Sequence, residues 1–246
     1  MNQAPHAILA DRRKFSGRRG VFSARAGFTL VEMLVVITII VGLMAVAAAR
    51  LNSSNPGDAT KTSSSQLRGL AELTQSKALS TGNYTALLIC KKFDAPEDRC
   101  LRYVIVVERQ LKTNGNPAVG ADYDWVAVSN GSYLERGTHY WPDWGGGYDL
   151  TFAMDGTLKL GAAFNSLTKS DWIGLVFSPQ GLPVEPTGLS PANLPENPKF
   201  IVTLGLPAST GLEVTENDKK LSEGFMIQRS NGRTVIIESP VRQLTL

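Results

Sequence analysis

The longest apolar stretch of the chain lies near its N-terminus, where Phe28 to Ala49 hold a single charged residue, Glu32. A helix of this length spans roughly 33 Å, which is enough to cross a bilayer. A secretory signal has a shorter apolar segment, about 7–15 residues, with its cleavage site after that segment. Here the small residue, Gly27, comes before the apolar run. Cleavage at Gly27 would therefore leave the hydrophobic helix on the mature protein.

The pattern changes between Leu51 and Thr60, where Asn-Ser-Ser-Asn-Pro-Gly interrupts the apolar run. Proline followed by glycine is expected to kink or stop the helix near Pro56. Helical spacing then returns over Lys61–Ser80, with apolar and small residues three and four positions apart on one face. We therefore predict a linker and an amphipathic helix over residues 51–83.

From residue 84 to residue 246 the pattern has period two and is rich in β-branched residues, which is typical of strands. Prolines over Ser178–Pro198 predict an extended loop, and Asn231-Gly232 predicts the turn of a terminal hairpin. The whole order predicts an α+β fold, in which a long interrupted helix precedes a β-rich head of antiparallel strands. The predicted strands are Tyr84–Lys91, Leu101–Glu108, Tyr123–Ser129, Leu150–Met154, Trp172–Phe177, Phe200–Leu206, Phe225–Ser230 and Arg233–Glu238.

The first 27 residues form a basic leader with six Lys and Arg residues against one Asp. The positive-inside bias predicts that this end stays cytoplasmic, with a single pass of the inner membrane over residues 28–50 and the head outside the cytoplasm. The whole chain has 25 Lys and Arg and 22 Asp and Glu, so 19 and 21 remain after the leader. The net charge of +3 thus comes from the leader and argues against a nucleic-acid partner for the head.

Glu32 lies where a lone charge is disfavoured. A carboxylate costs about 2.5–3.5 kcal/mol near the centre of a membrane, and less near the interface. Its side chain could reach back to the lipid headgroups, or it could await a partner. If the chain is cut between Gly27 and Phe28, the new ammonium of Phe28 on a neighbouring subunit could neutralise Glu32. Such a pair would fix the axial register between subunits.

The residues Gly27-Phe28-Thr29-Leu30-Val31-Glu32, followed by Met33-Leu34-Val35-Val36, resemble the cleavage and methylation motif of type IV prepilins and type II secretion pseudopilins. The resemblance implies cleavage after Gly27 by a prepilin peptidase, N-methylation of Phe28 and a registering role for Glu32. It also implies a structural filament subunit and not an enzyme. Its partners would be other pilin or pseudopilin subunits, the inner-membrane assembly platform and the lipid bilayer. Many members have a proline about 22 residues into the mature chain, where this chain has Ala49.

The head is similar to the H-type minor pseudopilins and their FimT-like relatives at Leu73–Ala78, Val176–Gly181 and Asn231–Arg233. Some FimT-like pilins bind DNA through a C-terminal Gly-Arg-x-Arg motif. This chain has Gly232-Arg233-Thr234-Val235 and lacks the second arginine. A head that binds DNA or a glycan remains the alternative function. The arginines of the hairpin are otherwise solvated or form salt bridges; they are Arg229, Arg233 and Arg242.

Cys90 and Cys100, the two cysteines, bracket nine residues between two predicted strands. A disulfide across this hairpin would add about 2–3 kcal/mol in an oxidising compartment. The alternative is a pair of free thiols at the strand ends. A metal site is not expected, because the chain has no CxxC spacing and His139 is the only histidine after the leader.

Three further sets of residues have candidate chemistry. The stretch Trp141–Asp149 combines aromatics with flexible glycines, and it could bind a sugar or a partner, or pack onto the sheet. His139 could act as a base, but the chain lacks a recognisable nucleophile motif, so neither an enzyme nor a cofactor is expected. Four aspartates could ligate calcium, although they lack EF-hand spacing. They are Asp122, Asp124, Asp143 and Asp149.

Overall fold

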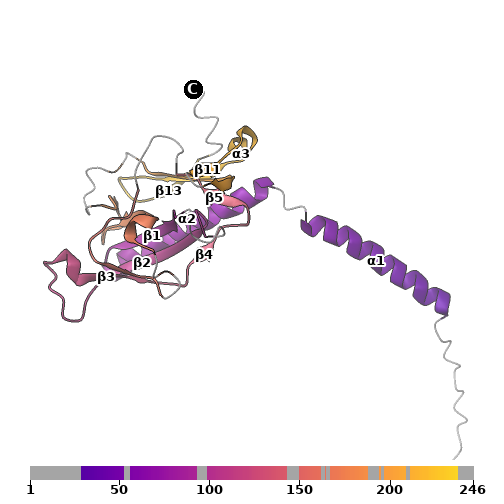
Figure 1. Ribbon diagram of the computed structural model, residues 1–246, viewed down its shortest axis with the longest axis horizontal. Coiled ribbons are helices and arrows are strands. Elements are labelled where there is room, and N and C mark those ends of the chain that lie inside the picture. Colours follow the sequence, from indigo (N-terminus) through magenta and orange to yellow (C-terminus); the bar gives the residue numbers. More distant parts are fainter. Residues whose placement is uncertain are drawn as a thin grey trace, which may run out of the picture. The chain divides into compact units, whose positions relative to one another are not determined.

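The computed structural model describes the chain in two compact units, which the contacts divide at residues 53 and 54. The first unit contains helix α1 (Leu30–Asn52), and the second is the head (Figure 1). Side chains of the first unit are described for residues 29–44. The described ranges are 29–52, 56–92, 99–142, 150–161, 164, 167–187, 194, 197–208 and 211–237.

Helix α1 is 23 residues long and strongly apolar, with Glu32 in its first turn. Every described side chain of α1, from Leu30 to Met44, is exposed. The stretches of chain that the structure describes contain no helix with both the length and the hydropathy of a membrane span.

Helix α2 (Pro56–Thr81) begins five residues earlier than the predicted Lys61. The correction has a simple cause: proline lacks an N–H group and has a fixed φ, and both suit the first turn of a helix. The buried positions recur every three or four residues, as predicted for one face. They are Thr60, Ser63, Leu67, Ala71, Thr74 and Ala78. The helix ends before Gly82, which has a φ of +68°.

A seven-stranded sheet forms one layer of the head, in the order β6-β3-β2-β1-β7-β8 with β4 beside β2. Neighbours are antiparallel except β3 and β6. The predicted strand Leu150–Met154 is wrong, since only Thr151 makes a bridge, to Ile173. The predicted proline-rich loop contains the short β8. The strands are β1 (Thr85–Cys90), β2 (Tyr103–Leu111), β3 (Tyr123–Ala127), β4 (Ser132–Tyr133), β6 (Thr157–Lys159), β7 (Trp172–Phe177) and β8 (Pro183–Val184).

A second sheet has the order β13-β12-β9-β5, and all of its pairs are antiparallel. Its strands are β5 (Thr138–Tyr140), β9 (Lys199–Leu204), β12 (Glu223–Ile227) and β13 (Thr234–Ile237). Between β9 and β12 lie elements that the sequence pattern did not predict, the hairpin β10 (Leu206–Ala208) and β11 (Gly211–Glu213) and the helix α3 (Glu216–Lys220). Two 3-10 turns, Gly120–Asp122 and Lys169–Asp171, precede β3 and β7.

The terminal hairpin differs from the prediction in its register. Ile227 pairs with Thr234, so the loop is longer than the two-residue Asn-Gly turn. Gly232 has a φ of +69°, and a Cβ there would lie 2.3 Å from both Gln75 Nε2 and the Gly181 carbonyl oxygen. Because the loop packs directly on α2, its contacts rather than ideal turn chemistry set its shape.

Helix α2 packs between the two sheets. In Figure 1, strands of the larger sheet such as β2 and strands of the second sheet such as β13 lie on either side of it. One apolar cluster joins α2 to the inner faces of both sheets through residues such as Leu67, Val104 and Phe225. A second cluster, including Trp125 and Trp172, covers the other face of the larger sheet. Because that sheet is buried on both faces, every residue of β1 and β7 is buried, and all but Thr85 are apolar instead of alternating with polar residues. The α+β prediction with an antiparallel, sheet-rich head is confirmed.

Candidate functional site

The cleavage and methylation motif, Gly27–Val36, is called the assembly motif below. Its described part begins at Thr29 and forms a capping box at the start of α1. The Glu32 backbone N–H donates to Thr29 Oγ1 at 3.2 Å, and the Thr29 N–H donates to Glu32 Oε2 at 3.5 Å. These reciprocal bonds satisfy two of the donors that a helix N-terminus leaves without partners. They explain why the helix begins directly after Thr29. The Thr-x-x-Glu spacing at residues 29–32 is the sequence signal of this capping box.

The capping box also sets the electrostatics of Glu32. Its carboxylate lies at the positive end of the helix dipole, which stabilises an anion. It is folded back toward the backbone of Thr29, the residue that follows Phe28. Gly27 and Phe28 themselves lie outside the described residues. Cleavage after Gly27 would create an ammonium at Phe28, the residue directly before Thr29, whose N–H already donates to this carboxylate.

The remainder of α1 presents apolar side chains all around its described length. Leu30 is 82% exposed, Ile37 57% and Leu43 65%. A helix that is hydrophobic on every side is normally buried in a membrane or among other helices. At about 25 cal/mol per Å² of apolar surface, covering such a helix strongly favours association. The described geometry therefore suits burial by lipid or by neighbouring copies.

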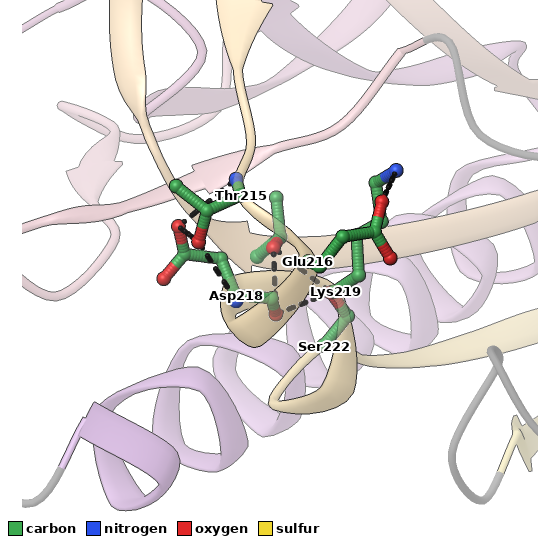
Figure 2. Close-up of polar contacts among 6 residues, drawn as sticks. Thr215, Glu216, Asp218, Lys219 and Ser222 are labelled. Carbon is green, nitrogen blue, oxygen red and sulfur yellow. Dashed lines mark hydrogen bonds and ion pairs between the residues drawn. The ribbon is translucent and has the colours of Figure 1, made fainter.

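The polar cluster around α3 is structural. Figure 2 shows Thr215 capping α3: its Oγ1 accepts from the Asp218 N–H at 3.3 Å, and its own N–H donates to Asp218 Oδ2 at 3.1 Å. Ser222 Oγ donates to the Asp218 carbonyl oxygen at 3.1 Å, and Lys219 pairs with Glu216. Thr60 of α2 donates to the Leu221 carbonyl oxygen at 2.8 Å. This network holds α3 and the residues that follow it against the start of α2.

The expected disulfide is not formed, because Cys90 and Cys100 are free and buried. Cys90 belongs to the apolar cluster on one face of the larger sheet, and Cys100 to the cluster on the other face. Burial raises the pKa of both thiols; for Cys100, burial and then the neighbouring Cys90 raise the pKa to about 12. Both groups are therefore protonated and unreactive at neutral pH.

His139 is buried on β5, where its backbone pairs with Thr203. Burial, followed by the positive charge of Arg102, lowers the pKa of His139 to about 4. Its Nδ1 atom has no hydrogen-bond partner among the described residues. A neutral histidine inside the core is a packing residue in this setting.

Of the four candidate calcium ligands, the two that the structure describes, Asp122 and Asp124, have other partners. Asp122 accepts from the Asn116 N–H at 2.9 Å, and buried Asp124 pairs with Lys159 at 2.6 Å. Asp143 and Asp149 lie outside the described residues. Over the described ranges, the structure contains no group of three or more acidic, histidine or cysteine residues placed to bind a metal.

Of the aromatic and glycine-rich stretch, the described part is Trp141 and Pro142. Trp141 is partly buried and packs against the apolar cluster around α2, as in the alternative in which the aromatics cover the sheet. The other residues of the stretch, 143–149, lie outside the described residues.

An open groove lies between α2 and β12–β13. The groove has a volume of about 190 Å³ and includes Arg68, Glu223, Phe225 and Ile236 in its lining. Arg68 Nε donates to Glu72 Oε1 at 2.9 Å and to Thr234 Oγ1 at 3.0 Å. The Thr234 hydrogen bond, and then Arg68, lower the pKa of Glu72.

Arg233 is exposed and Arg229 is half-buried on this hairpin. Arg242 lies outside the described residues. The groove therefore combines acidic and basic groups, and it does not form a uniformly basic surface of the kind that nucleic acids bind.

Comparisons with known proteins agree with the motif at the start of α1. The family described as the prokaryotic N-terminal methylation motif matches residues 22–48. None of the curated proteins matches the chain. Among solved structures, the type IV minor pilin FimU of Pseudomonas aeruginosa is similar, with 11% sequence identity and a TM-score of 0.37; the match covers 74% of this chain and 90% of that chain.

The matched residues include Gly27, Phe28 and Glu32, the residues on which the predicted cleavage, methylation and registration depend. The match confirms the N-terminal motif that the sequence predicted. The N-terminal part of the chain therefore carries the prokaryotic N-terminal methylation motif, over residues 22–48.

Proposed function

We propose that this chain is a minor subunit of a type IV pilus or a type II secretion pseudopilus, made as a precursor and cut after Gly27. The observation that carries the proposal is the composition of α1 beside its capped end. A helix with apolar side chains on every described side begins one residue after Thr29 and has a single carboxylate, Glu32. Such a helix is stable only when lipid or other helices cover it.

The proposed life cycle assigns a role to each region. Residues 1–27 are a leader that stays cytoplasmic and is removed by a prepilin peptidase, which also methylates Phe28. Residues 28–50 anchor the subunit in the inner membrane as a single pass and later form the filament core. Residues 51–83 connect the core to the head, residues 84–246, which lies outside the cytoplasm. The other partners are neighbouring pilin subunits and the inner-membrane assembly platform.

Glu32 would set the register through an exchange of hydrogen-bond partners. In a single subunit its carboxylate accepts a long bond from the Thr29 N–H, at 3.5 Å. In the filament, the ammonium of Phe28 from the next subunit would offer a charged donor. Charge-assisted bonds are about twice as strong as neutral ones, so the exchange favours assembly in one register.

Mass spectrometry of filaments sheared from cells tests the processing step. The expected mature chain has 219 of the 246 residues and begins with N-methylated Phe28. A Gly27→Val variant is expected to remain uncut and absent from the filaments. A Gly69→Ala variant, altered at an open position of α2, is the matched control and should be processed normally. A mature N-terminus at any other residue, or normal processing of Gly27→Val, would contradict the proposal.

A further inference from the structure

Arg109 is a half-buried cation that lies close to two aromatic rings at one end of the larger sheet. Its Cζ atom lies 3.8 Å from the centre of the Tyr123 ring and 5.8 Å from that of Tyr84. The Tyr84 carbonyl oxygen accepts from the Arg109 N–H at 2.8 Å, which joins the two backbones. Tyr123 Oη donates to the Pro117 carbonyl oxygen at 3.2 Å, which positions the Tyr123 ring. These contacts restrict the guanidinium to the neighbourhood of the Tyr123 ring.

This guanidinium has no counter-charge in the part of the chain that the structure describes. The acidic residue before it, Glu108, bonds Asn83 Nδ2 at 2.8 Å and lies 3.8 Å from Lys77. On the adjacent strand, Asp124 is paired with Lys159. Arg109 Nε is buried and makes no hydrogen bond to the described residues. An arginine that loses water without gaining an anion is costly unless a partner supplies one.

We propose that Arg109 is the anchor of a docking surface for an acidic residue of a partner protein, whose carboxylate pairs with the Nη groups of the guanidinium. Arginine and carboxylate pair in one plane through two parallel bonds. Because the Tyr123 ring lies 3.8 Å from Cζ and covers a face of the guanidinium, an anion reaches the Nη groups most readily in the guanidinium plane, which suits a flat carboxylate. A phosphate group carries more charge, and it would meet one cation beside Glu108 and Asp124.

The surroundings favour a protein segment over a small free acid. Leu111, which is 44% exposed, lies opposite Tyr123 in the strand register and extends the surface with an apolar side chain. Arginine and tyrosine are enriched at the centres of protein interfaces because both contribute large, rigid contact areas. A small acid could use the cation but not the neighbouring leucine.

The docking surface lies at the C-terminal end of α2, where Asn83 bonds Glu108 on β2. A 26-residue helix is roughly 39 Å long, so this end is remote from Pro56, where the chain leads to α1. The inference does not rest on the proposed assembly role, because it concerns a different end of the head.

Fluorescence anisotropy with the full chain in detergent tests the inference. The probes are labelled acetyl-Leu-Glu-Leu-amide and its glutamine counterpart, acetyl-Leu-Gln-Leu-amide, with unlabelled acetate and inorganic phosphate as competitors. We expect the glutamate peptide to bind at least tenfold more tightly than the glutamine peptide. Arg109→Gln should abolish this preference, and Arg109→Lys should reduce it at least fivefold because lysine lacks the planar fork.

Two control variants separate recognition from folding. Arg233→Gln removes an exposed cation elsewhere and should leave binding unchanged. Tyr123→Phe keeps the ring and should bind within twofold of wild type, whereas Tyr123→Leu should bind several-fold more weakly. Equal binding of the two peptides, or binding that survives Arg109→Gln, would overturn the proposal. If phosphate displaces the peptide at a lower concentration than acetate does, the choice of a carboxylate is wrong. If acetate binds as tightly as the glutamate peptide, the choice of a protein segment is wrong.

Discussion

Helix α1 and the head differ in the exposure of their apolar side chains: those of α1 are exposed, and most of those of the head are buried. In α1, Leu34 is 58% exposed and Ile37 57%, and none of the described side chains is buried. In the head, Trp125, Phe200 and Phe225 are at most 1% exposed. The head therefore has a core of its own, while α1 depends on what surrounds it. This difference teaches that folding and assembly can be altered separately by substitutions in the two regions.

The largest effect on the free energy of unfolding is expected from Phe225→Ala. Phe225 stacks on Phe200 with ring centres 5.5 Å apart, and its removal leaves a cavity in the cluster around α2. Such truncations cost about 3–5 kcal/mol. Leu34→Ala is the matched substitution in α1 and should change the unfolding of the head by less than about 0.5 kcal/mol. Urea unfolding in detergent measures both, and an equal loss in the two variants would break the comparison.

A second effect on stability should depend on pH through His139. Its pKa is about 4 when folded, below the ordinary value of 6.5, because the core favours the neutral ring. The unfolded chain therefore binds a proton first as the pH falls. Stability from this group is full above pH 6.5, declines toward pH 4 and is lost below it, a change of about 3 kcal/mol. Unfolding midpoints of wild type and His139→Gln should converge at low pH; parallel pH profiles would exclude this role.

The smallest effects are expected at two glycines that differ in backbone conformation and in surroundings. Gly232→Ala should destabilise the head by at least about 1 kcal/mol, because φ is +69° and a Cβ would collide with Gln75. Gly69→Ala lies in the interior of α2 with open space around it and should stabilise the head by about 0.5–1 kcal/mol. Thermal unfolding of the two variants should shift in opposite directions; a shift of the same sign would mean that the hairpin loop does not pack on α2 as described.

Much of the secondary structure could be predicted from the sequence, because the spacing of apolar residues indicated which positions are buried. Continuous apolar runs marked β1 and β7, and residues three and four apart marked the buried face of α2. Leu150–Met154 failed as a strand because Phe152 and Met154 are buried against the larger sheet, beside a single bridge at Thr151. An apolar pattern reports burial, and burial does not require a ladder of hydrogen bonds.

The polar parts were harder to predict. Helix α3 is short and charged, and its signal was local: Thr215 and Asp218 form a capping box. The same kind of signal at Thr29 and Glu32 marked the start of α1. The separation of Cys90 and Cys100 into different clusters could not be read from their spacing, since it depends on which face of the sheet each residue meets.

The cage around Arg109 also lay beyond the sequence pattern. Tyr84 and Tyr123 are separated from it by 25 and 14 positions, and strand pairing brings them together. Sequence reasoning found the assembly motif because its residues are consecutive. It missed the cage because its members meet only in the folded head.

The most direct test of the assembly account is the amount of Glu32→Gln subunit in sheared filaments, measured against wild type at equal expression. Glutamine keeps an oxygen that can accept from the Thr29 N–H, so the capping box is retained while the charge is removed. The account predicts normal cleavage after Gly27, a head as stable as wild type, and at least tenfold less subunit in the filaments. Incorporation of Glu32→Gln at the wild-type level would contradict the claim that this carboxylate registers the subunits.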